Sequence, residues 1–148
     1  MMAVESIDLL LVDDSADDTA FVLHALGTAG LAPATRTAQD GAEALDLLFG
    51  DEGSETGALR LVPRLIILDL KMPKVDGIEV LRRLKSNPQA RAVPVVVWSS
   101  SLEKRDLTTS YDLGVNSYLV KPMDAGEFAR SIREVVRYWL TLNRVSWS

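Results

Sequence analysis

The amino-acid sequence predicts a doubly wound α/β domain built on a five-stranded parallel sheet. Short runs of Val, Ile and Leu recur along the chain with little alternation of apolar and polar residues, which is typical of parallel strands covered on both faces. Between these runs, apolar residues recur with the period of a helix. Because crossovers between parallel strands are right-handed, five β-α units place helices on both faces of one sheet.

Four strands are predicted from clear apolar runs and a fifth from a weaker signal. The weaker segment is Ala32–Ala38, and Pro33 near its start fits an edge strand because proline cannot donate a ladder hydrogen bond. The four clear runs are Ile7–Val12, Leu65–Leu70, Val93–Trp98 and Ser117–Val120.

Helices are expected after each strand, and four of them carry a capping signal. A side-chain cap followed three residues later by an acid marks a helix start, and Gly or Pro marks its end. The capping pairs are Ser15 with Asp18, Asp40 with Glu43, Asp76 with Glu79, and Asp124 with Glu127; the stop signals are Gly27 and Gly30, Gly50, Pro88 and Gly114. The faces expected to pack inward are Val22, Ala25, Leu26 and Ala29; Ala42, Leu45 and Phe49; Val80, Leu81 and Leu84; Leu107, Tyr111 and Gly114; and Phe128, Ile132, Val135, Val136 and Trp139.

Composition restricts the class of protein. The 148 residues fit one domain, 1–148, with a core of about residues 6–140, a C-terminal extension over 141–148, and an exposed insertion at Gly50–Pro63. The chain has no cysteine, which excludes disulfides and thiolate metal sites. Its net charge of −5 argues against nucleic acid as the main partner, and no apolar run is long enough for a signal peptide or membrane span. We therefore expect a cytoplasmic location and no membrane partner.

Polar residues follow the predicted strands at the points where they end. Asp13 and Asp14 follow the first, Asp69 the third, and Lys121 the fifth, while Ser99 and Ser100 follow the fourth. Ligands of open parallel sheets bind at the carboxyl ends of the strands, so we expect these side chains to share one pocket.

Three neighbouring carboxylates repel one another, and a divalent cation resolves the conflict. Carboxylates, a backbone carbonyl and retained waters suit the octahedral oxygen shell of Mg²⁺, with Lys121 free to pair with phosphate oxygens. A carboxylate can act as a nucleophile toward phosphorus. Asp69 is the best candidate because it is the lone acid that ends the central strand.

The segments LLLVDDS (9–15), LIILDLKMPKVDGIEVL (65–81), VPVVVWSSS (93–101) and YLVKP (118–122) resemble the receiver domain of two-component response regulators. This resemblance covers the chain from about Ile7 to Trp139. It implies a flavodoxin-like receiver fold with strand order 2-1-3-4-5, and phosphoryl transfer from a histidine kinase to Asp69.

The resemblance also implies roles for other residues at the expected pocket. Asp13, Asp14, Asp69 and the backbone carbonyl of Lys71 would hold Mg²⁺. Lys121 would pair with the phosphoryl group, Ser99 and Tyr118 would change position as the switch, and the Lys121–Pro122 bond would be cis. The Lys71 side chain is a departure, because so long a cation at the edge of the pocket could shield the acyl phosphate or attract an incoming partner.

Within this family, the chain is most similar to stand-alone regulators that serve bacterial phytochromes. The extended loop before the central strand and the YWL segment at 138–140 carry this narrower likeness. It implies a light-sensing histidine kinase as partner. With no output domain after residue 148, the signal is expected to leave through a protein contact or a phosphoryl relay, or to end in a phosphate sink.

Several residues also have simpler interpretations. Asp13 and Asp14 could cap a helix, Ser99 could bond to backbone, Tyr118 could serve only the core, and Trp98 is expected to pack. His24 is expected on the surface without a catalytic part.

The C-terminal region suggests an interface. Its last predicted helix carries Arg130, Arg133 and Arg137 on one face, which could be a solubilising surface or a docking surface. The apolar residues Trp139, Leu140, Leu142, Val145 and Trp147 continue beyond what the sheet needs, and they predict a homodimer through this region.

Two other functions use similar residues. A Mg²⁺-dependent phosphohydrolase also forms an aspartyl phosphate, but it needs a second acid where this chain has Lys71. A pseudo-receiver that only binds partners would not need the whole set of Asp13, Asp14, Asp69, Ser99 and Lys121. The prediction is therefore a signalling switch rather than an enzyme.

Overall fold

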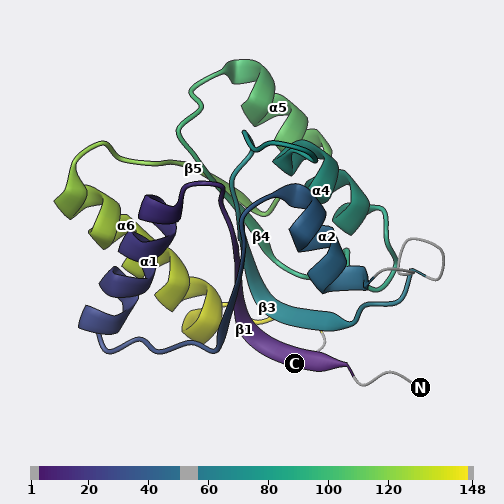
Figure 1. Ribbon diagram of the computed structural model, residues 1–148, viewed down its shortest axis with the longest axis horizontal. Coiled ribbons are helices and arrows are strands. Elements are labelled where there is room, and N and C mark those ends of the chain that lie inside the picture. The colour runs from purple at the N-terminus through teal and green to yellow at the C-terminus, as the bar shows by residue number, and fades with distance from the viewer. Residues whose placement is uncertain (1–3, 51–56, 147–148) are drawn as a thin grey trace.

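The computed structural model describes residues 4–50 and 57–146. A five-stranded, all-parallel sheet has the order β2-β1-β3-β4-β5, as predicted. Helices α1 and α6 cover one face, and α2, α4 and α5 cover the other (Figure 1). The strands are β1 (Glu5–Val12), β2 (Thr35–Ala38), β3 (Leu61–Leu68), β4 (Val95–Ser99) and β5 (Ser117–Val120). The helices are α1 (Ala16–Thr28), α2 (Gly41–Phe49), α4 (Gly77–Lys85), α5 (Lys104–Asp112) and α6 (Ala125–Arg137), followed by a π-helix, η1 (Tyr138–Leu142).

Successive residues of the central strands enter different cores, because side chains of a strand alternate between the two faces. In β1, Leu10 and Val12 pack on the side of α2 and α4, while Leu9 and Leu11 pack on the side of α1 and α6. Both sets are fully buried. Two covered faces explain why the strands are almost continuously apolar.

All four predicted capping pairs form. Ser15, Asp40, Asp76 and Asp124 each accept a hydrogen bond from the backbone N–H three residues later. These bonds satisfy donors that a helix start leaves without a partner, so the helices begin where the pattern predicts. Strand bounds shift by up to four residues, most clearly at β3, which includes the predicted loop residues 61–63.

Two predicted helix faces need correction, that of α2 in part and that of α5 in full. In α2, Phe49 is buried as predicted and Leu45 packs against the core, but Ala44 and Leu48 are buried as well and Ala42 lies only partly inside. In α5, Leu107 and Tyr111 are exposed, and the polar residues Asp106 and Ser110 face inward instead. The weak apolar period of α5 did not reveal that its inner face is held by hydrogen bonds.

The C-terminal region is only partly exposed. Trp139 and Leu140 pack against the core beside α1 and α6, while Tyr138 and Leu142 remain exposed. Trp147 and residues 51–56 of the predicted insertion before β3 lie outside the described residues, and Leu59 within that insertion is buried. No helix among the described residues is long and apolar enough to cross a membrane.

Candidate functional site

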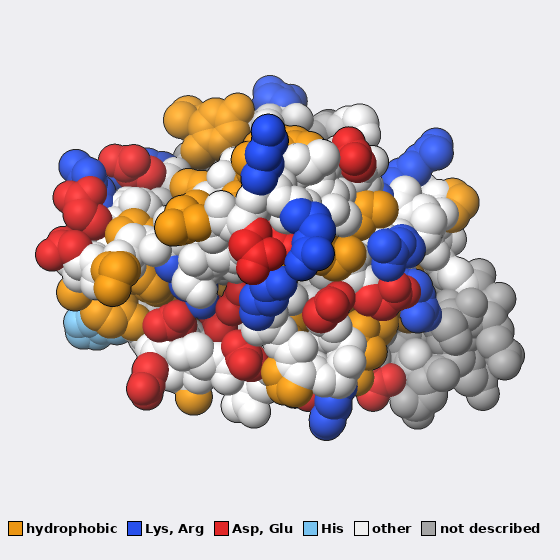
Figure 2. Space-filling view, turned by 90° about the horizontal axis from the view of Figure 1, so that it is seen from above, with side chains coloured by type: hydrophobic (Ala, Val, Ile, Leu, Met, Phe, Trp, Pro, Cys, Tyr) orange, Lys and Arg blue, Asp and Glu red, His pale blue; other side chains and the backbone are white. Residues whose placement is uncertain are grey.

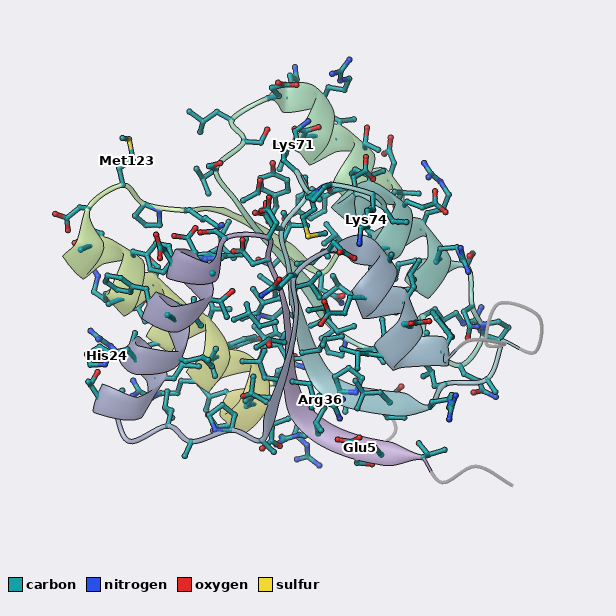
Figure 3. All side chains as sticks on the ribbon, in the orientation of Figure 1. Glu5, His24, Arg36, Lys71, Lys74 and Met123 are labelled. Atoms are coloured by element: carbon teal, nitrogen blue, oxygen red, sulfur yellow. The ribbon has the colours of Figure 1, made fainter. Side chains whose placement is uncertain are left out.

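The predicted site residues meet at the carboxyl edge of the sheet. Backbone hydrogen bonds continue past the strand ends: Asp13 donates to Ala38, Asp69 to Val12, and Lys121 to Ser99. These bonds fix the starting point of each functional side chain. Lys71 and Met123 lie at this edge in Figure 3, whereas Glu5 and Arg36 lie toward the opposite end.

Three carboxylates form a compact acidic cluster. Oxygen atoms of Asp13, Asp14 and Asp69 lie within 4.8 Å of one another. Asp13 and Asp69 are buried, while Asp14 is exposed and opens the cluster to solvent. Three close oxygen ligands with access from solvent fit a hard divalent cation that keeps part of its water shell. These are the three carboxylates predicted from the sequence.

The Lys121 ammonium lies among three carboxylates, one of which sequence reasoning did not place here. Its Nζ donates to Asp13 Oδ2 and to Asp18 Oδ2 at 2.8 Å each, and to Asp69 Oδ2 at 3.3 Å. An ammonium has three donors, so these contacts use all of them. Asp18 had been predicted only as part of the capping signal of α1, and the sequence held no signal for its contact with a lysine about one hundred residues away.

Burial and pairing have opposite effects on the pKa values of Asp13 and Lys121. Burial raises the pKa of the Asp13 carboxyl to about 6, against the lowering effect of the hydrogen bonds from Lys121 and Ser15. Burial alone would lower the pKa of the Lys121 amine, but the bonds to Asp13 and Asp18 and the charge of Asp69 raise it overall. The lysine therefore stays charged, and burial opposes ionisation of Asp13.

A second hydrogen-bonded group connects the end of β4 to α5 and β5. The backbone N–H of Ser101 donates to Ser99 Oγ at 3.2 Å, and the Tyr118 hydroxyl donates to the Ser101 carbonyl at 3.1 Å. Ser101 Oγ donates to Asp106 at 2.5 Å, and Lys71 Nζ lies 3.4 Å from the same carboxylate. The two predicted switch residues, Ser99 and Tyr118, therefore meet at one loop.

The pKa values of Asp106 and Tyr118 are shifted in opposite directions in this group. The hydrogen bond from Ser101, followed by the charge of Lys71, lowers the pKa of the Asp106 carboxyl. Burial raises the pKa of the Tyr118 hydroxyl. Asp106 and Ser101 were not singled out from the sequence, since a lone acid and a lone hydroxyl five residues apart form no motif.

Gly77 makes room for the backbone of Asp69. A Cβ atom at Gly77 would lie 2.1 Å from the Asp69 carbonyl oxygen and 2.7 Å from Leu70 Cα. The Gly77 N–H also donates to the Leu70 carbonyl at 2.9 Å. The start of α4 is thus pressed against the residue that follows β3, which only glycine allows.

The structure corrects some of the smaller predictions made from the sequence and confirms another. The described residues contain no cis peptide bond, so the cis Lys121–Pro122 bond implied by the resemblance is wrong; the trans form is the default by about 0.5–1 kcal/mol. Ser100 is exposed, whereas Ser99 is buried. The Lys71 side chain pairs with Asp106, which draws it toward α5. His24 is exposed on α1, as predicted (Figure 3).

Trp98 packs, as expected. It is buried against Phe128 of α6, with ring centroids 5.1 Å apart, and Phe128 contacts Phe21 of α1 at the same separation. These edge-to-face contacts tie β4 to both helices of that face.

Exposed apolar side chains lie near the acidic cluster. Figure 2 views this edge of the molecule and shows acidic and basic side chains together, with hydrophobic ones around them. Met123, which follows Lys121 and Pro122, is fully exposed, and Leu102 in the loop after β4 is 83% exposed. Such side chains beside a polar site favour contact with another protein.

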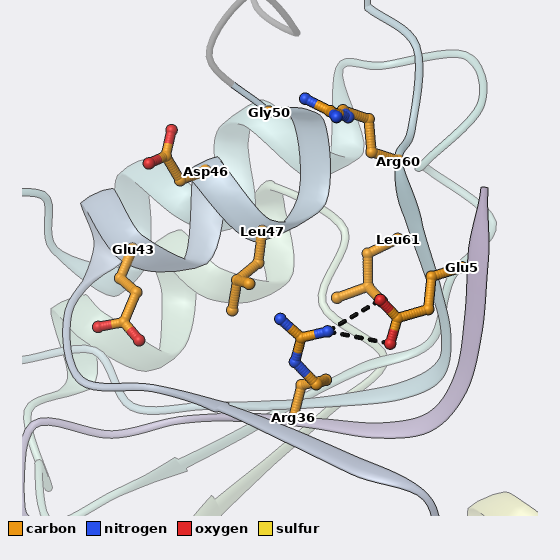
Figure 4. Close-up of a pocket in the computed structure, with 8 residues that line it drawn as sticks. All are labelled: Glu5, Arg36, Glu43, Asp46, Leu47, Gly50, Arg60 and Leu61. Carbon is orange, nitrogen blue, oxygen red and sulfur yellow. Dashed lines mark hydrogen bonds and ion pairs between the residues drawn. The ribbon is translucent and has the colours of Figure 1, made fainter. Parts of the chain in front are cut away.

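A cavity of about 410 Å³ lies elsewhere, between β1, β2 and α2 (Figure 4). Arg36 Nη1 donates to both carboxylate oxygens of Glu5 inside it, at 2.8 and 3.0 Å. Glu43, Asp46 and Arg60 also line it, so both acidic and basic side chains face this cavity. None of the predicted site residues lines this cavity, and it is separate from the acidic cluster.

Comparison with known proteins decides the family. The model of the response regulator receiver domain matches residues 9–133. The chain belongs to the response regulator receiver domain family. The predicted strand order and the acidic cluster agree with this membership.

Individual relatives cover most of the receiver domain. The probable methanogenesis regulatory protein FilR2 of Methanothrix harundinacea is 39% identical over 136 residues, 92% of this chain and 85% of FilR2. Response regulator Rcp1 of Synechocystis is 36% identical over 132 residues, 89% of this chain and 88% of Rcp1. The receiver domain is therefore the phosphoacceptor switch of a two-component system.

Solved structures support the same conclusion. The Mn²⁺-bound form of Rcp1 has a TM-score of 0.83 at 33% identity, covering 94% of this chain and 98% of that one. The phosphorylated cyanobacterial phytochrome response regulator RcpA has a TM-score of 0.83 at 32% identity, covering 97% and 99%. The narrower resemblance to regulators of bacterial phytochromes is thereby confirmed.

Proposed function

We propose that the receiver domain takes a phosphoryl group onto Asp69 with Mg²⁺ held by Asp13, Asp14, Asp69 and the Lys71 carbonyl. The proposal rests on the meeting of three carboxylates and one buried lysine at a single strand edge. Among the described residues, no other group of three or more His, Asp or Glu side chains is arranged to hold a metal ion. We treat residues 1–148 as one domain with a core of about 6–140.

In the proposed reaction, a carboxylate oxygen of Asp69 attacks phosphorus in line with the bond to the donor. The phosphorus–nitrogen bond of a phosphohistidine breaks, and its electron pair stays on the imidazole. Bound Mg²⁺ would neutralise charge on the transferring oxygens. Lys121 pairs with one phosphoryl oxygen, and Ser99 Oγ gives up the Ser101 N–H to donate to another.

Mg²⁺ is chosen over softer metals because the donor set is entirely oxygen. Asp13, Asp14 and Asp69 supply carboxylates, and none of the described residues adds an imidazole to this cluster. All-oxygen sites suit Mg²⁺ and Mn²⁺. The Mn²⁺-bound Rcp1 structure supports a divalent cation in a similar receiver domain.

The same arrangement favours a signalling role over a phosphohydrolase. Lys71 stands two residues after Asp69, where a hydrolase needs a general acid, and its side chain pairs with Asp106. A lysine at this position replaces the carboxyl group that gives up and takes back a proton in such chemistry. We therefore propose that turnover is confined to gain and slow loss of one phosphoryl group.

The proposed phosphoryl donor is a histidine kinase of the phytochrome type, in the cytoplasm. RcpA, the cyanobacterial phytochrome response regulator, supports this choice through its fold and its 32% identity. The exposed Met123 and Leu102 beside the acidic cluster suit the docking of such a partner.

The experiment that tests the function is intact mass after incubation with acetyl phosphate. We expect a Mg²⁺-dependent gain of one phosphoryl group in the wild type and none in Asp69→Asn. Asp46→Asn is a matched control, because Asp46 lies on α2 away from the acidic cluster. An adduct that persists in Asp69→Asn, or that forms without Mg²⁺, would contradict the assignment.

We also propose a homodimer through the C-terminal helices. Tyr138 is 48% exposed and Leu142 is 69% exposed on η1, next to the exposed Arg137. A second copy would cover these apolar side chains, which a monomer leaves in water.

Sedimentation equilibrium tests the dimer. Wild type and the control Leu23→Ser, which changes an exposed leucine of α1, should form dimers. Leu142→Ser should shift the equilibrium toward monomers. A wild-type monomer at high concentration, with and without the phosphoryl mimic beryllofluoride, would exclude this interface.

A further inference from the structure

Asp18 is the one carboxylate around Lys121 that the proposed chemistry does not use. The other two, Asp13 and Asp69, belong to the acidic cluster. Asp18 lies in the first turn of α1, about one-third exposed, and its Oδ2 accepts from Lys121 Nζ at 2.8 Å. This distance equals that to Asp13 and is shorter than the 3.3 Å to Asp69.

The backbone around Asp18 is held in place. Its N–H donates to the side chain of Ser15, which caps α1, and α1 packs against α6 through Phe21 and Phe128. The carboxylate therefore projects from a fixed helix turn, and it can hold a mobile ammonium at a defined point.

Both carboxylate oxygens of Asp13 already accept a hydrogen bond. Its Oδ1 accepts from the Ser15 N–H at 2.9 Å and its Oδ2 accepts from Lys121 at 2.8 Å. A divalent cation on Asp13 would compete with Lys121 for the Asp13 carboxylate, and so would weaken one of the two shortest contacts of the ammonium. Asp18 then offers the remaining short contact, at a place that still lies within reach of Asp69.

We propose that Asp18 is a positioning residue, which holds the Lys121 ammonium beside Asp69 while Asp13 turns to the metal. The inference deepens, and rests on, the proposed phosphoryl transfer. Without Asp18, the lysine would follow Asp13 or move toward solvent, and the phosphoryl oxygens would meet a less ordered cation.

Three variants separate positioning from charge. Asp18→Ala removes the acceptor, Asp18→Asn keeps an acceptor oxygen but loses the charge, and Asp17→Asn makes the same charge change at the exposed neighbouring residue. Phosphorylation by acetyl phosphate is measured at saturating Mg²⁺, so that weaker metal binding does not affect the rate. Thermal unfolding of each variant checks that α1 remains folded.

We expect Asp18→Ala to slow phosphorylation by at least about tenfold. Asp18→Asn should stay within about threefold of the wild type, and Asp17→Asn should match it. Equal rates for Asp18→Ala and wild type would overturn the proposal. So would equal losses in Asp17→Asn and Asp18→Asn, because that result would indicate a general charge effect.

A second readout is independent of phosphorylation. The ¹⁵N signal of the Lys121 ammonium, assigned by its loss in Lys121→Arg, is recorded with saturating Mg²⁺. We expect a signal protected from exchange in the wild type, Asp18→Asn and Asp17→Asn, and its loss in Asp18→Ala. A protected signal in Asp18→Ala overturns the positioning role, whereas a wild type that takes no phosphoryl group overturns only the proposed function.

Discussion

The buried Asp13 carboxyl makes the stability of the folded protein depend on pH. Asp13 has its pKa raised to about 6 by burial, above its ordinary value of 3.8. The folded protein therefore holds a proton on Asp13 that the unfolded chain has already released between these two pH values. Stability must fall as the pH rises through this window, and Asp13 costs most above about pH 6.

Asp13→Asn should therefore stabilise the metal-free protein at neutral pH. We expect a gain of about 2 kcal/mol in the free energy of unfolding at pH 7.5 and little change near pH 4, because the cost of ionising Asp13 disappears there. Urea unfolding in the presence of a chelator measures both values. Asp17→Asn is the control, and a gain that is equal at both pH values would contradict the assignment to Asp13.

The absence of a side chain at Gly77 allows α4 to pack closely against the backbone of Asp69. Gly77→Ala would put a methyl group 2.1 Å from the Asp69 carbonyl oxygen, so the loop after β3 must shift. We expect a loss of about 1–3 kcal/mol in unfolding free energy, together with slower phosphorylation of Asp69. Chemical denaturation and intact mass measure the two effects.

Gly27→Ala is the matched control for this substitution. No atom lies within 4 Å of a Cβ at Gly27, which is in α1, so alanine should be neutral or stabilising by about 0.5–1 kcal/mol. If Gly77→Ala were as stable as Gly27→Ala and equally well phosphorylated, the close approach of α4 to Asp69 would not matter for stability or for phosphorylation.

Helix α5 depends on its polar inner face. Its N-cap residue, Glu103, makes no side-chain capping bond, and Asp106 in the first turn instead accepts from Ser101 and pairs with Lys71. Ser110 Oγ donates to the Asp106 carbonyl at 2.7 Å. The helix is thus attached to the switch loop by hydrogen bonds where the other helices use apolar packing.

Asp106→Ala should loosen α5 and the switch loop together. We expect a loss of about 1–3 kcal/mol in unfolding free energy, since the partly buried Ser101 hydroxyl loses its acceptor. Asp106→Asn should lose less, because it keeps an acceptor and loses only the ion pair with the largely exposed Lys71. The control is Asp112→Ala at the exposed end of the same helix, and equal losses at 106 and 112 would show that the inner contacts do not matter.

The pH dependence of Asp106 has the opposite sign to that of Asp13. The pKa of Asp106 is lowered in the folded protein, so its contribution is present above the ordinary pKa of an aspartate and lost as the pH falls through the folded value. The difference between the wild type and Asp106→Asn should therefore shrink in acid.

At the scale of the whole molecule, hydrogen bonds connect the site to β4, α5 and β5 on one side of the sheet. Ser99 ends β4, Tyr118 lies on β5, and both reach the Ser101 loop that precedes α5. A phosphoryl group that draws in Ser99 Oγ removes the acceptor of the Ser101 N–H. The equilibrium between arrangements of β4, α5 and β5 must then shift.

We expect beryllofluoride with Mg²⁺ to change amide hydrogen exchange in residues 99–112 and 117–120. Residues 16–28 of α1 serve as the internal reference, apart from the first turn that holds Asp18. Ser99→Ala should bind the mimic but show a smaller change, because the proposed phosphoryl contact is missing. Tight binding with no change on this side of the sheet would contradict a population shift.

Much of the fold and the acidic cluster could be predicted from local patterns. Apolar runs, capping pairs and stop signals depend on neighbours in the sequence, and parallel strands bring Asp13, Asp69 and Lys121 to one edge whatever the details of packing. The bounds of β5 and all four capping bonds agree with the pattern.

Other features depend on contacts between distant segments, which no local pattern contains. The inner face of α5 was wrongly predicted because the hydrogen bond from Ser101 and the ion pair with Lys71 outweigh its weak apolar period. Asp18 joins the site only because folding carries Lys121 to the first turn of α1, and Gly77 matters only because α4 presses on the end of β3. The spacing of apolar residues indicates which face of a helix or strand is buried. Only the folded chain determines which side chains from different elements meet.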